Sequence, residues 1–251
     1  MMKEKKEIRE INSNEVEIFI NIIRKALDFS YLIPSIYRSD NIYKFITIEL
    51  TNKFSPYKYF GVFDSDQMIA CAEFKKVTGK TVFLNMIATK PGFQKHGLGR
   101  MLINYATDVF LLDGFDYMEL DVYNDNKIAR YWYSNLGFKE ISNKSFFSLN
   151  KMSNEIKKCE LFINNYPQFC LMKKEFGFGF LDVTLKSGRF NFGFIQNDLI
   201  LRNDTFDISK SDIRCLFDCL DIDNIYFIGE IENTLDRFNY LNKVFRLSLK
   251  F

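Results

Sequence analysis

A short glycine-containing turn follows the strand that we predict over residues 81–89. Gln94, Gly97 and Gly99 give it a Q-x-x-G-x-G pattern, and a helix is predicted from Gly99 to about Leu112. Because glycine has no side chain and the first amides of a helix lack acceptors within the helix, the backbone here can bind an anion. The helix dipole favours the same charge, so a pyrophosphate would fit. By itself such a short glycine pattern more often marks a tight loop, and it matches neither G-x-G-x-x-G nor a P-loop.

Carboxylates supply a second kind of candidate chemistry. Residues 116–123 alternate between apolar and polar side chains, which predicts a strand that directs Glu119 and Asp121 to the same face. Two neighbouring carboxylates can raise the pKa of one of them, as a general base working near neutral pH requires. The alternative is that both only solvate the sheet or bind a lysine. Glu73, on a strand predicted over 68–75, is a second candidate base.

Histidine and cysteine offer no predicted metal site. The one histidine, His96, lies inside the glycine turn, a position that argues against a role as a base. Cys215 and Cys219 lie four residues apart on a predicted helix and could share a face, which we interpret as core packing. The cysteines form no even, closely spaced framework, so we expect them to be reduced and mostly buried, and we expect no metal. The five are Cys71, Cys159, Cys170, Cys215 and Cys219.

A second segment gives the glycine turn its context. The segment NKIARYWYSNLGF follows the turn, and with it resembles the GNAT superfamily of N-acetyltransferases. The signature of that family is a Q/R-x-x-G-x-G/A turn and a later N-x-x-A-x-x-x-Y-x-x-x-G-F segment. The resemblance covers about residues 8–149 and is sharp across 82–138. The matching positions of the second segment are Asn126, Ala129, Tyr133, Gly137 and Phe138.

The resemblance implies an α/β (α+β) fold with a mixed, splayed β-sheet flanked by helices, and acetyl-CoA as the co-substrate. The turn amides and the Gln94 side chain would hold the diphosphate. The pantetheine arm would pair with residues 87–89 like an added strand, in a gap beside residues 116–123. The residues implied to bind the cofactor are Ile87, Ala88, Thr89, Gln94, Lys95, His96, Gly97, Leu98, Gly99, Arg100, Asn126 and Tyr133.

The resemblance also implies catalytic roles. Tyr133 would lie near the thioester sulfur and give a proton to the departing thiolate, while Asp121 stands where several members carry a base. The Asn126 side chain would hydrogen-bond the pantetheine arm, and Trp132 would be a core or substrate-wall residue. The implied activity is transfer of an acetyl (acyl) group to a primary amine of a small molecule or peptide, by direct attack on the thioester.

Two other functions remain open. One is a catalytically inactive, CoA-binding regulatory or scaffold protein, and the other is an acyltransferase that modifies charged tRNA. With 34 basic and 32 acidic residues and a formal charge of +2, the chain has no electrostatic footprint for nucleic acid or an anionic membrane. The sequence shows neither a secretory signal nor a stretch of about 20 apolar residues, so we expect a soluble, cytoplasmic protein.

The first half of the chain is predicted as a domain over residues 1–150. A helix is expected at 15–27, capped by Ser13 or Asn14, and a less regular helical stretch at 38–52. A hairpin turns at residues 64–67. After the motifs, a helix at 125–136 and two short strands at 138–141 and 145–149 complete this domain.

Residues 151–251 are predicted as a second, strand-rich α+β domain, with a polar boundary at 150–158, and the pattern also allows a helix through 153–164. Its strand, helix, strand ending echoes the first half, which suggests a degenerate second GNAT-like copy. It has no Q-x-x-G-x-G turn, so we expect one CoA per chain. It could cover the acceptor, form a homodimer or close a second sheet. The predicted elements are strands at 168–175, 176–185, 190–196 and 198–202, a helix at 209–220 capped by Ser209 or Ser211, and two final strands, NIYFIGEI and VFRLSLKF.

Overall fold

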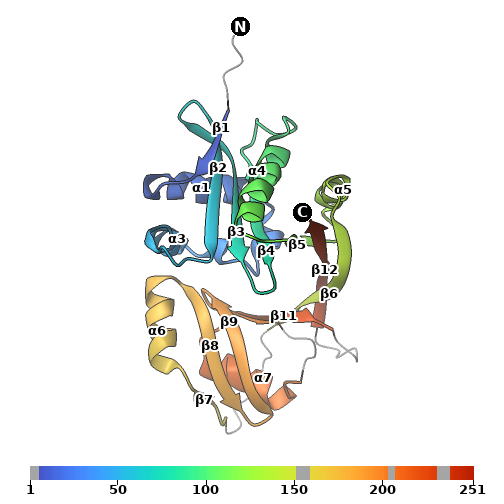
Figure 1. Cartoon of the computed structure of the whole chain (residues 1–251). Helices are drawn as coiled ribbons and strands as arrows, with labels where there is room; N and C mark the ends of the chain where they lie inside the picture. Colours follow the sequence, from blue (N-terminus) through green and yellow to red (C-terminus); the bar gives the residue numbers. More distant parts are fainter. Residues whose placement is uncertain (1–5, 151–158, 203–206, 231–237) are drawn as a thin grey trace. The chain divides into compact units, whose positions relative to one another are not determined.

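The computed structural model describes residues 6–150, 159–202, 207–230 and 238–251 (Figure 1). The chain forms two compact units. Unit 1 contains residues 1–33, 43–143 and 245–251, and unit 2 contains residues 34–42 and 144–244. The units are interleaved in sequence, because residues 34–42 belong to unit 2 and residues 245–251 to unit 1. The division into domains 1–150 and 151–251 remains a prediction.

The first half of the chain contributes six strands and five α-helices among its described residues. A 3-10 turn, Ser13–Glu15, precedes the first helix, and another, Ile36–Arg38, precedes the third. The elements are β1 (Glu7–Glu10), α1 (Val16–Ala26), α2 (Phe29–Leu32), α3 (Ile42–Thr51), β2 (Tyr57–Asp64), β3 (Gln67–Lys76), β4 (Thr81–Thr89), α4 (Leu98–Leu112), β5 (Tyr117–Tyr123), α5 (Lys127–Asn135) and β6 (Lys139–Asn150).

The second half follows the same scheme with fewer helices. Its described elements are β7 (Phe162–Ile163), α6 (Tyr166–Glu175), β8 (Phe178–Leu185), β9 (Gly188–Ile195), β10 (Asp198–Arg202), α7 (Lys210–Cys219), β11 (Asn224–Gly229) and β12 (Phe238–Lys250). In both halves an antiparallel three-strand meander leads into a helix and then into a strand parallel to the last strand of the meander. The echo that the sequence suggested is therefore present in the fold.

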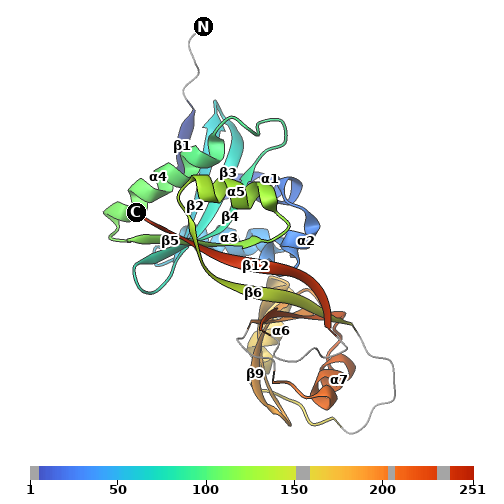
Figure 2. The same cartoon turned by 90° about the vertical axis from the view of Figure 1, so that its right-hand side faces the viewer.

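Each unit has its own run of strands. In unit 1 the order is β1-β2-β3-β4-β5-β12, and in unit 2 it is β6-β11-β10-β9-β8-β7. β6 belongs to unit 2 from residue 144 onward and pairs there with β11, antiparallel, from Ser145 to Asn150. The end of β12 belongs to unit 1, where the Phe251 N–H donates to the Asp116 carbonyl at 2.9 Å. Each unit thus takes its closing strand from the other half of the chain, and Figure 2 shows β12 ending beside β5.

Helices cover both faces of the unit 1 sheet. On β3, the Cys71 side chain contacts the Phe19 carbonyl of α1, whereas the Phe74 ring packs against Phe110 of α4 at 5.5 Å between centroids. Since successive strand residues point to opposite faces, α1 and α4 lie on opposite sides. The helix expected at 15–27 is present as α1, and four of its five expected core residues, Val16, Phe19, Ile20 and Ile23, are buried. The fifth, Leu27, follows the end of the helix and is half-buried.

Several expectations about local structure are wrong. Residues 168–175 lie in helix α6 rather than in the predicted strand. Pro167, at the start of α6, has a fixed backbone angle that suits the first turn of a helix, and the local apolar pattern did not reveal this helix. β1 was not predicted at all. The two short strands expected at 138–141 and 145–149 are one strand, β6. Residues 153–158 of the suggested helix at 153–164 lie outside the described residues, and Phe162–Ile163 are a strand.

The expected caps of α1 are also wrong. Ser13 and Asn14 belong to the 3-10 turn that precedes the helix, and the Asn12 N–H donates to the Glu15 carboxylate at 2.7 Å. In contrast, Ser209 caps α7, accepting from the Asp212 N–H at 3.2 Å. No helix within the described ranges is long and apolar enough to cross a membrane.

The cysteines differ from the expectation of a reduced, mostly buried set. Cys159 and Cys215 form a disulfide, and of the remaining three only Cys71 is buried. The pairing joins residues 56 positions apart. Spacing in the sequence could not reveal it, because the fold alone brings the segment before β7 against α7.

Candidate active site

The turn between β4 and α4 has the open backbone that the sequence predicts. Gly97 stands at the N-cap of α4 with φ of 76°, in the left-handed region that favours glycine, and residues 94–97 are exposed. Within the described part of the chain, nothing accepts a hydrogen bond from the backbone N–H groups of Gln94 to Arg100. This run of unpaired donors at a helix N-terminus can bind an anion such as a diphosphate.

Gly99 is required for packing rather than for the open turn. A Cβ at this position would lie 2.9 Å from Cζ2 of Trp132 on α5, closer than real Cβ atoms approach any neighbour. By contrast, a Cβ at Gly97 would meet nothing within 4 Å. The two glycines of the motif therefore serve different purposes: Gly97 keeps the turn open, and Gly99 lets α5 approach α4.

The sheet opens between β4 and β5. These parallel strands pair from Thr81 with Tyr117 to Leu84 with Leu120. β4 then continues to Thr89 and β5 to Tyr123 without further pairing to each other in the described structure. The edge of β4 beyond Leu84 is therefore available for an extended ligand to pair with it, as an added strand would.

Only alternate residues of β4 present their backbone groups to this opening. The Lys90 N–H donates to the Ile69 carbonyl at 2.9 Å, so Lys90 and, two residues earlier, Ala88 point their N–H and C=O groups at β3. Ile87 and Thr89 must then point theirs away from β3, toward the gap. Of the three predicted pantetheine contacts, the geometry thus favours Ile87 and Thr89 over Ala88.

A β-bulge lies where the strands part. Glu73 pairs with Met86 while Phe74 pairs with Leu84, which leaves Asn85 as the extra residue. The Asn85 side-chain amide donates to the Glu73 carboxylate at 2.6 Å, and only 2% of Glu73 is exposed. Burial, with the Glu73 charge as a second cause, raises the pKa of Tyr57 to about 12. A buried carboxylate therefore lies directly beside the opening.

Asp121 is already paired. The Arg246 guanidinium, which β12 contributes to unit 1, donates to both carboxylate oxygens of Asp121 at 2.5 and 3.0 Å. It also reaches Glu119 at 3.4 Å and stacks over the Phe83 ring. The predicted pair of carboxylates on one face is therefore bridged by a cation, and the partner is an arginine rather than the lysine of the alternative interpretation.

Tyr133 and Asn126 are held by α5. Tyr133 is buried, packs against Phe138 with 5.5 Å between ring centroids, and burial raises the pKa of its hydroxyl. The side-chain oxygen Oδ1 of Asn126 accepts from the Ala129 N–H at 3.1 Å and so caps the helix. That hydrogen bond leaves the Asn126 amide N–H groups for a ligand.

His96 lies within the exposed turn. Its Nδ1 is 3.2 Å from the Phe93 carbonyl oxygen, an interaction within the turn itself. His96 thus lies in the turn between β4 and α4, where the sequence places it. Lys95, next to it, has φ of 65°, in the left-handed region that is uncommon for residues other than glycine.

Sequence reasoning missed two residues of this site. Arg246 lies in the last strand, where only the tertiary fold brings it to Asp121. Asn85 is a polar residue in an otherwise apolar strand, a signal that was present in the sequence and was not used. Arg246 holds Asp121 in an ion pair, and the Asn85 side-chain amide hydrogen-bonds the buried Glu73 carboxylate.

Comparison with known proteins finds a family model that resembles part of the first half of the chain. The model of the acetyltransferase (GNAT) family matches residues 23–138. No curated protein matches the chain in sequence.

Solved structures resemble the whole chain in fold. A tandem GNAT protein from the clavulanic acid biosynthesis pathway is 9% identical, covers 98% of both chains and has a TM-score of 0.68. A candidate acetyltransferase from Pyrococcus horikoshii is 12% identical, covers all of this chain and 91% of its own, and has a TM-score of 0.65. A third, from Thermoplasma acidophilum, is 12% identical with a TM-score of 0.59 over 98% of this chain and 100% of its own. These likenesses show a tandem GNAT-like fold.

Proposed function

We propose that this protein transfers an acetyl group from acetyl-CoA to a primary amine, because residues 23–138 match the model of the acetyltransferase (GNAT) family. The family supports acyl transfer in general. The observation that carries the finer proposal is the combination of unpaired amides at residues 94–100 with an unpaired β4 edge next to them. A diphosphate joined to an extended amide-containing arm matches both features at once.

Binding of CoA would use the backbone more than side chains. The diphosphate accepts from the amides of the turn, where the N-terminus of α4 adds favourable charge. The two amides of the pantetheine arm then pair with Ile87 and Thr89, which present their N–H and C=O groups to the gap. Asn126 can donate to the same arm through its side-chain amide.

We assign the general base to Glu73 rather than Asp121. Both oxygens of Asp121 accept from Arg246, so this carboxylate is committed to an ion pair. Glu73 and Asp121 both lie on the face of the sheet that points away from α4. Glu73 contacts Asn85 at the point where β4 and β5 separate. Since Glu73 is 2% exposed, it would take the proton through a bound water.

Tyr133 is assigned as the general acid. Burial raises the pKa of its hydroxyl, so the group keeps its proton at neutral pH and can donate it. In the reaction the amine nitrogen forms a bond to the thioester carbon and the carbon–sulfur bond breaks. The amine proton passes to Glu73, and the CoA thiolate takes the proton of Tyr133.

Chromatographic measurement of CoA release, with a panel of primary amines, tests this function. We expect Glu73→Gln to lower turnover by about 100-fold or more, within the range for general base catalysis, with CoA affinity near wild type. Asp121→Asn serves as the matched carboxylate control and should have a smaller effect on turnover. Equal losses in both variants would remove the assignment of Glu73.

The inactive scaffold is the outcome to be distinguished. If the wild-type protein binds CoA but releases none from acetyl-CoA with any amine, the chain is a CoA-binding protein and the catalytic assignments are wrong. Tyr133→Phe gives an independent check, because loss of the acid should lower turnover without weakening CoA binding.

A further inference from the structure

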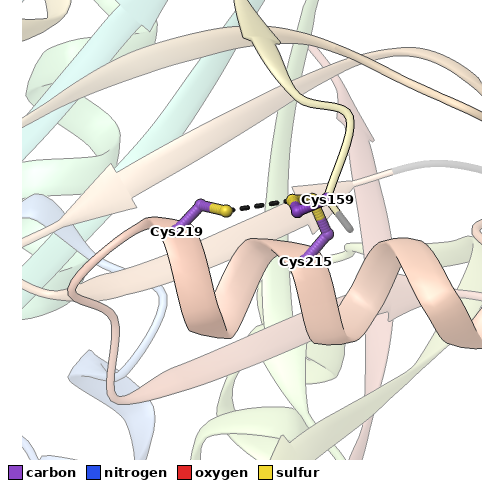
Figure 3. A group of neighbouring side chains, drawn as sticks. All are labelled: Cys159, Cys215 and Cys219. Carbon is purple, nitrogen blue, oxygen red and sulfur yellow. Dashed lines mark hydrogen bonds between the residues drawn. A yellow bond between two sulfur atoms is a disulfide. The ribbon is translucent and has the colours of Figure 1, made fainter. Parts of the chain in front are cut away.

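Three cysteine sulfurs meet in unit 2, whereas the residues proposed to bind CoA all belong to unit 1. Cys215 and Cys219 lie one turn apart on α7, and Cys159 lies on the irregular segment before β7 (Figure 3). Cys159 and Cys215 are joined by a disulfide, and the Cys219 sulfur is 2.9 Å from the Cys159 sulfur. All three sulfurs lie within 4.8 Å of one another. Such a cluster exceeds what a disulfide needs, because the third thiol has no part in the bond.

We propose that, when the disulfide is reduced, these three cysteines bind one Zn²⁺ ion as thiolates, with water as the fourth ligand. Thiolate is the preferred ligand of zinc in structural sites, and zinc takes four ligands in a tetrahedral arrangement. Residues four apart on a helix present their side chains on one face, so α7 supplies two ligands in fixed positions. Cys159 supplies the third ligand.

The geometry needs only small movements. Zinc–sulfur bonds of about 2.3 Å place tetrahedral ligands roughly 3.8 Å apart, so breaking the disulfide must let the sulfurs separate. Cys159 can make this adjustment because residues 159–161 have no regular secondary structure. The helix-borne pair would keep its backbone in place.

Burial explains why the fourth ligand is water. Cys215 is buried in the hydrophobic core of unit 2, while Cys219 is exposed. A metal between them would face the core on one side and solvent on the other. No further histidine, cysteine or carboxylate joins the group among the described residues, so solvent completes the coordination.

The two states exclude each other chemically. A dithiol reductant gives two electrons and two protons to the disulfide, producing the Cys159 and Cys215 thiols and oxidised reductant. Zinc then displaces one proton from each of three thiols, giving a tris-thiolate complex with one water and three released protons. Burial and the nearby Asp218 raise the pKa of Cys219, and a bound metal overcomes this by deprotonating the thiol outright.

Simple exchange between the disulfide and Cys219 is the competing chemistry. Attack of the Cys219 thiolate on the Cys159 sulfur, 2.9 Å away, would release the Cys215 thiolate and leave a Cys159–Cys219 disulfide. In either case Cys159 becomes attached to α7. Metal binding would therefore replace the disulfide as the cross-link in a reducing compartment.

A titration of the reduced, metal-free full-length chain with Co²⁺ tests the proposal. Five thiols per chain must first be counted, which shows that the disulfide is open. We expect one Co²⁺ per chain, with thiolate-to-cobalt absorption and the visible bands of tetrahedral Co²⁺, and displacement by Zn²⁺. Absence of these bands, or a disulfide that persists under the reductant, would overturn the proposal.

Cys219→Ser is the decisive variant, because it removes the third sulfur and leaves the disulfide pair. Its Co²⁺ affinity should fall at least tenfold, whereas Cys170→Ser, at an exposed cysteine outside the cluster, should bind as wild type does. Equal binding by both variants would contradict the site. If Cys219→Ser fails to fold, wild-type melting decides: Zn²⁺ should raise the Tm of the reduced form and leave the oxidised form unchanged, and equal shifts in both would contradict the site.

Discussion

The two crossover helices of the chain begin in opposite ways. α4 in unit 1 starts at Gly97 with no side-chain cap, and the amides before it have no acceptor in the described structure. α7 in unit 2 starts at Ser209, whose hydroxyl accepts from the Asp212 N–H, and the buried Asp212 carboxylate accepts from the Ser187 N–H at 2.7 Å. One helix start is open to an anion, and the other is satisfied by the protein itself.

The sheets beside these helices differ in the same sense. β4 and β5 pair over four residues and then separate, whereas β10 pairs with β11 along its whole length, from Asp198 to Arg202. Among its described residues, the second copy of the architecture therefore shows neither an uncapped helix start nor a separated pair of strands there. The same order of elements is thus present in both halves, whereas the turn and gap proposed to bind CoA are found in the first.

The largest expected difference between the two halves is that the second half binds no CoA. Isothermal titration with CoA should give one molecule bound per chain because, of the two described helix starts, that of α4 has no side-chain cap whereas that of α7 is capped by Ser209. A stoichiometry of two would break the comparison between the two helix starts, since the covered turn of unit 2 would then also bind.

Gly97→Asp should make the open helix start resemble the closed one. The carboxylate can accept from the first amides of α4 and repels a diphosphate, so CoA affinity should fall about 100-fold, or roughly 2.7 kcal/mol. Gly114→Asp is the matched control, because Gly114 also has positive φ and open space around it. Equal losses in both variants would show that the effect is not local to the turn.

Gly99→Ala should cost stability through a clash with Trp132. The added methyl would lie 2.9 Å from the ring, and overpacking of this kind costs about 1–3 kcal/mol. Denaturant unfolding measures the loss. In a Trp132→Leu background the same change should be neutral or stabilising, since Ala favours a helix more than Gly does. A loss that persists in that background would mean that Gly99 is not required by α5.

Ser209→Ala should have the smallest effect and only on stability. Loss of the cap of α7 should lower the free energy of unfolding by about 1 kcal/mol, measured by denaturation, while CoA affinity stays at the wild-type value. Ser211→Ala, which keeps the cap, should cost less. A change in CoA affinity from Ser209→Ala would mean that the two helix starts are not independent.

The sequence revealed the site region because its signals are local. Gly97 can adopt the left-handed backbone of the turn because it has no side chain, and the alternation over 116–123 is a property of that strand alone. The start of α7 at Ser209 was also predicted from its cap. Features of this kind depend on a few neighbouring residues, so one sequence suffices to find them.

What the sequence did not reveal depends on residues far apart. The ion pair of Asp121 with Arg246 spans 125 positions, and the disulfide spans 56. The role of Gly99 depends on Trp132, on another helix. No local pattern encodes such contacts, which explains why Asp121 looked like an available base and why the cysteines looked unpaired.

The crossing of β6 and β12 between the halves has a consequence for the history of this chain. A single ancestral copy would have had to complete its sheet with a strand borrowed from another molecule, as in a domain-swapped dimer. When two copies are joined in one polypeptide, the exchange of strands takes place within one chain, at the high effective concentration that a tether provides. A copy that lost its ligand would then still be needed, because its last strand completes the sheet of the other unit.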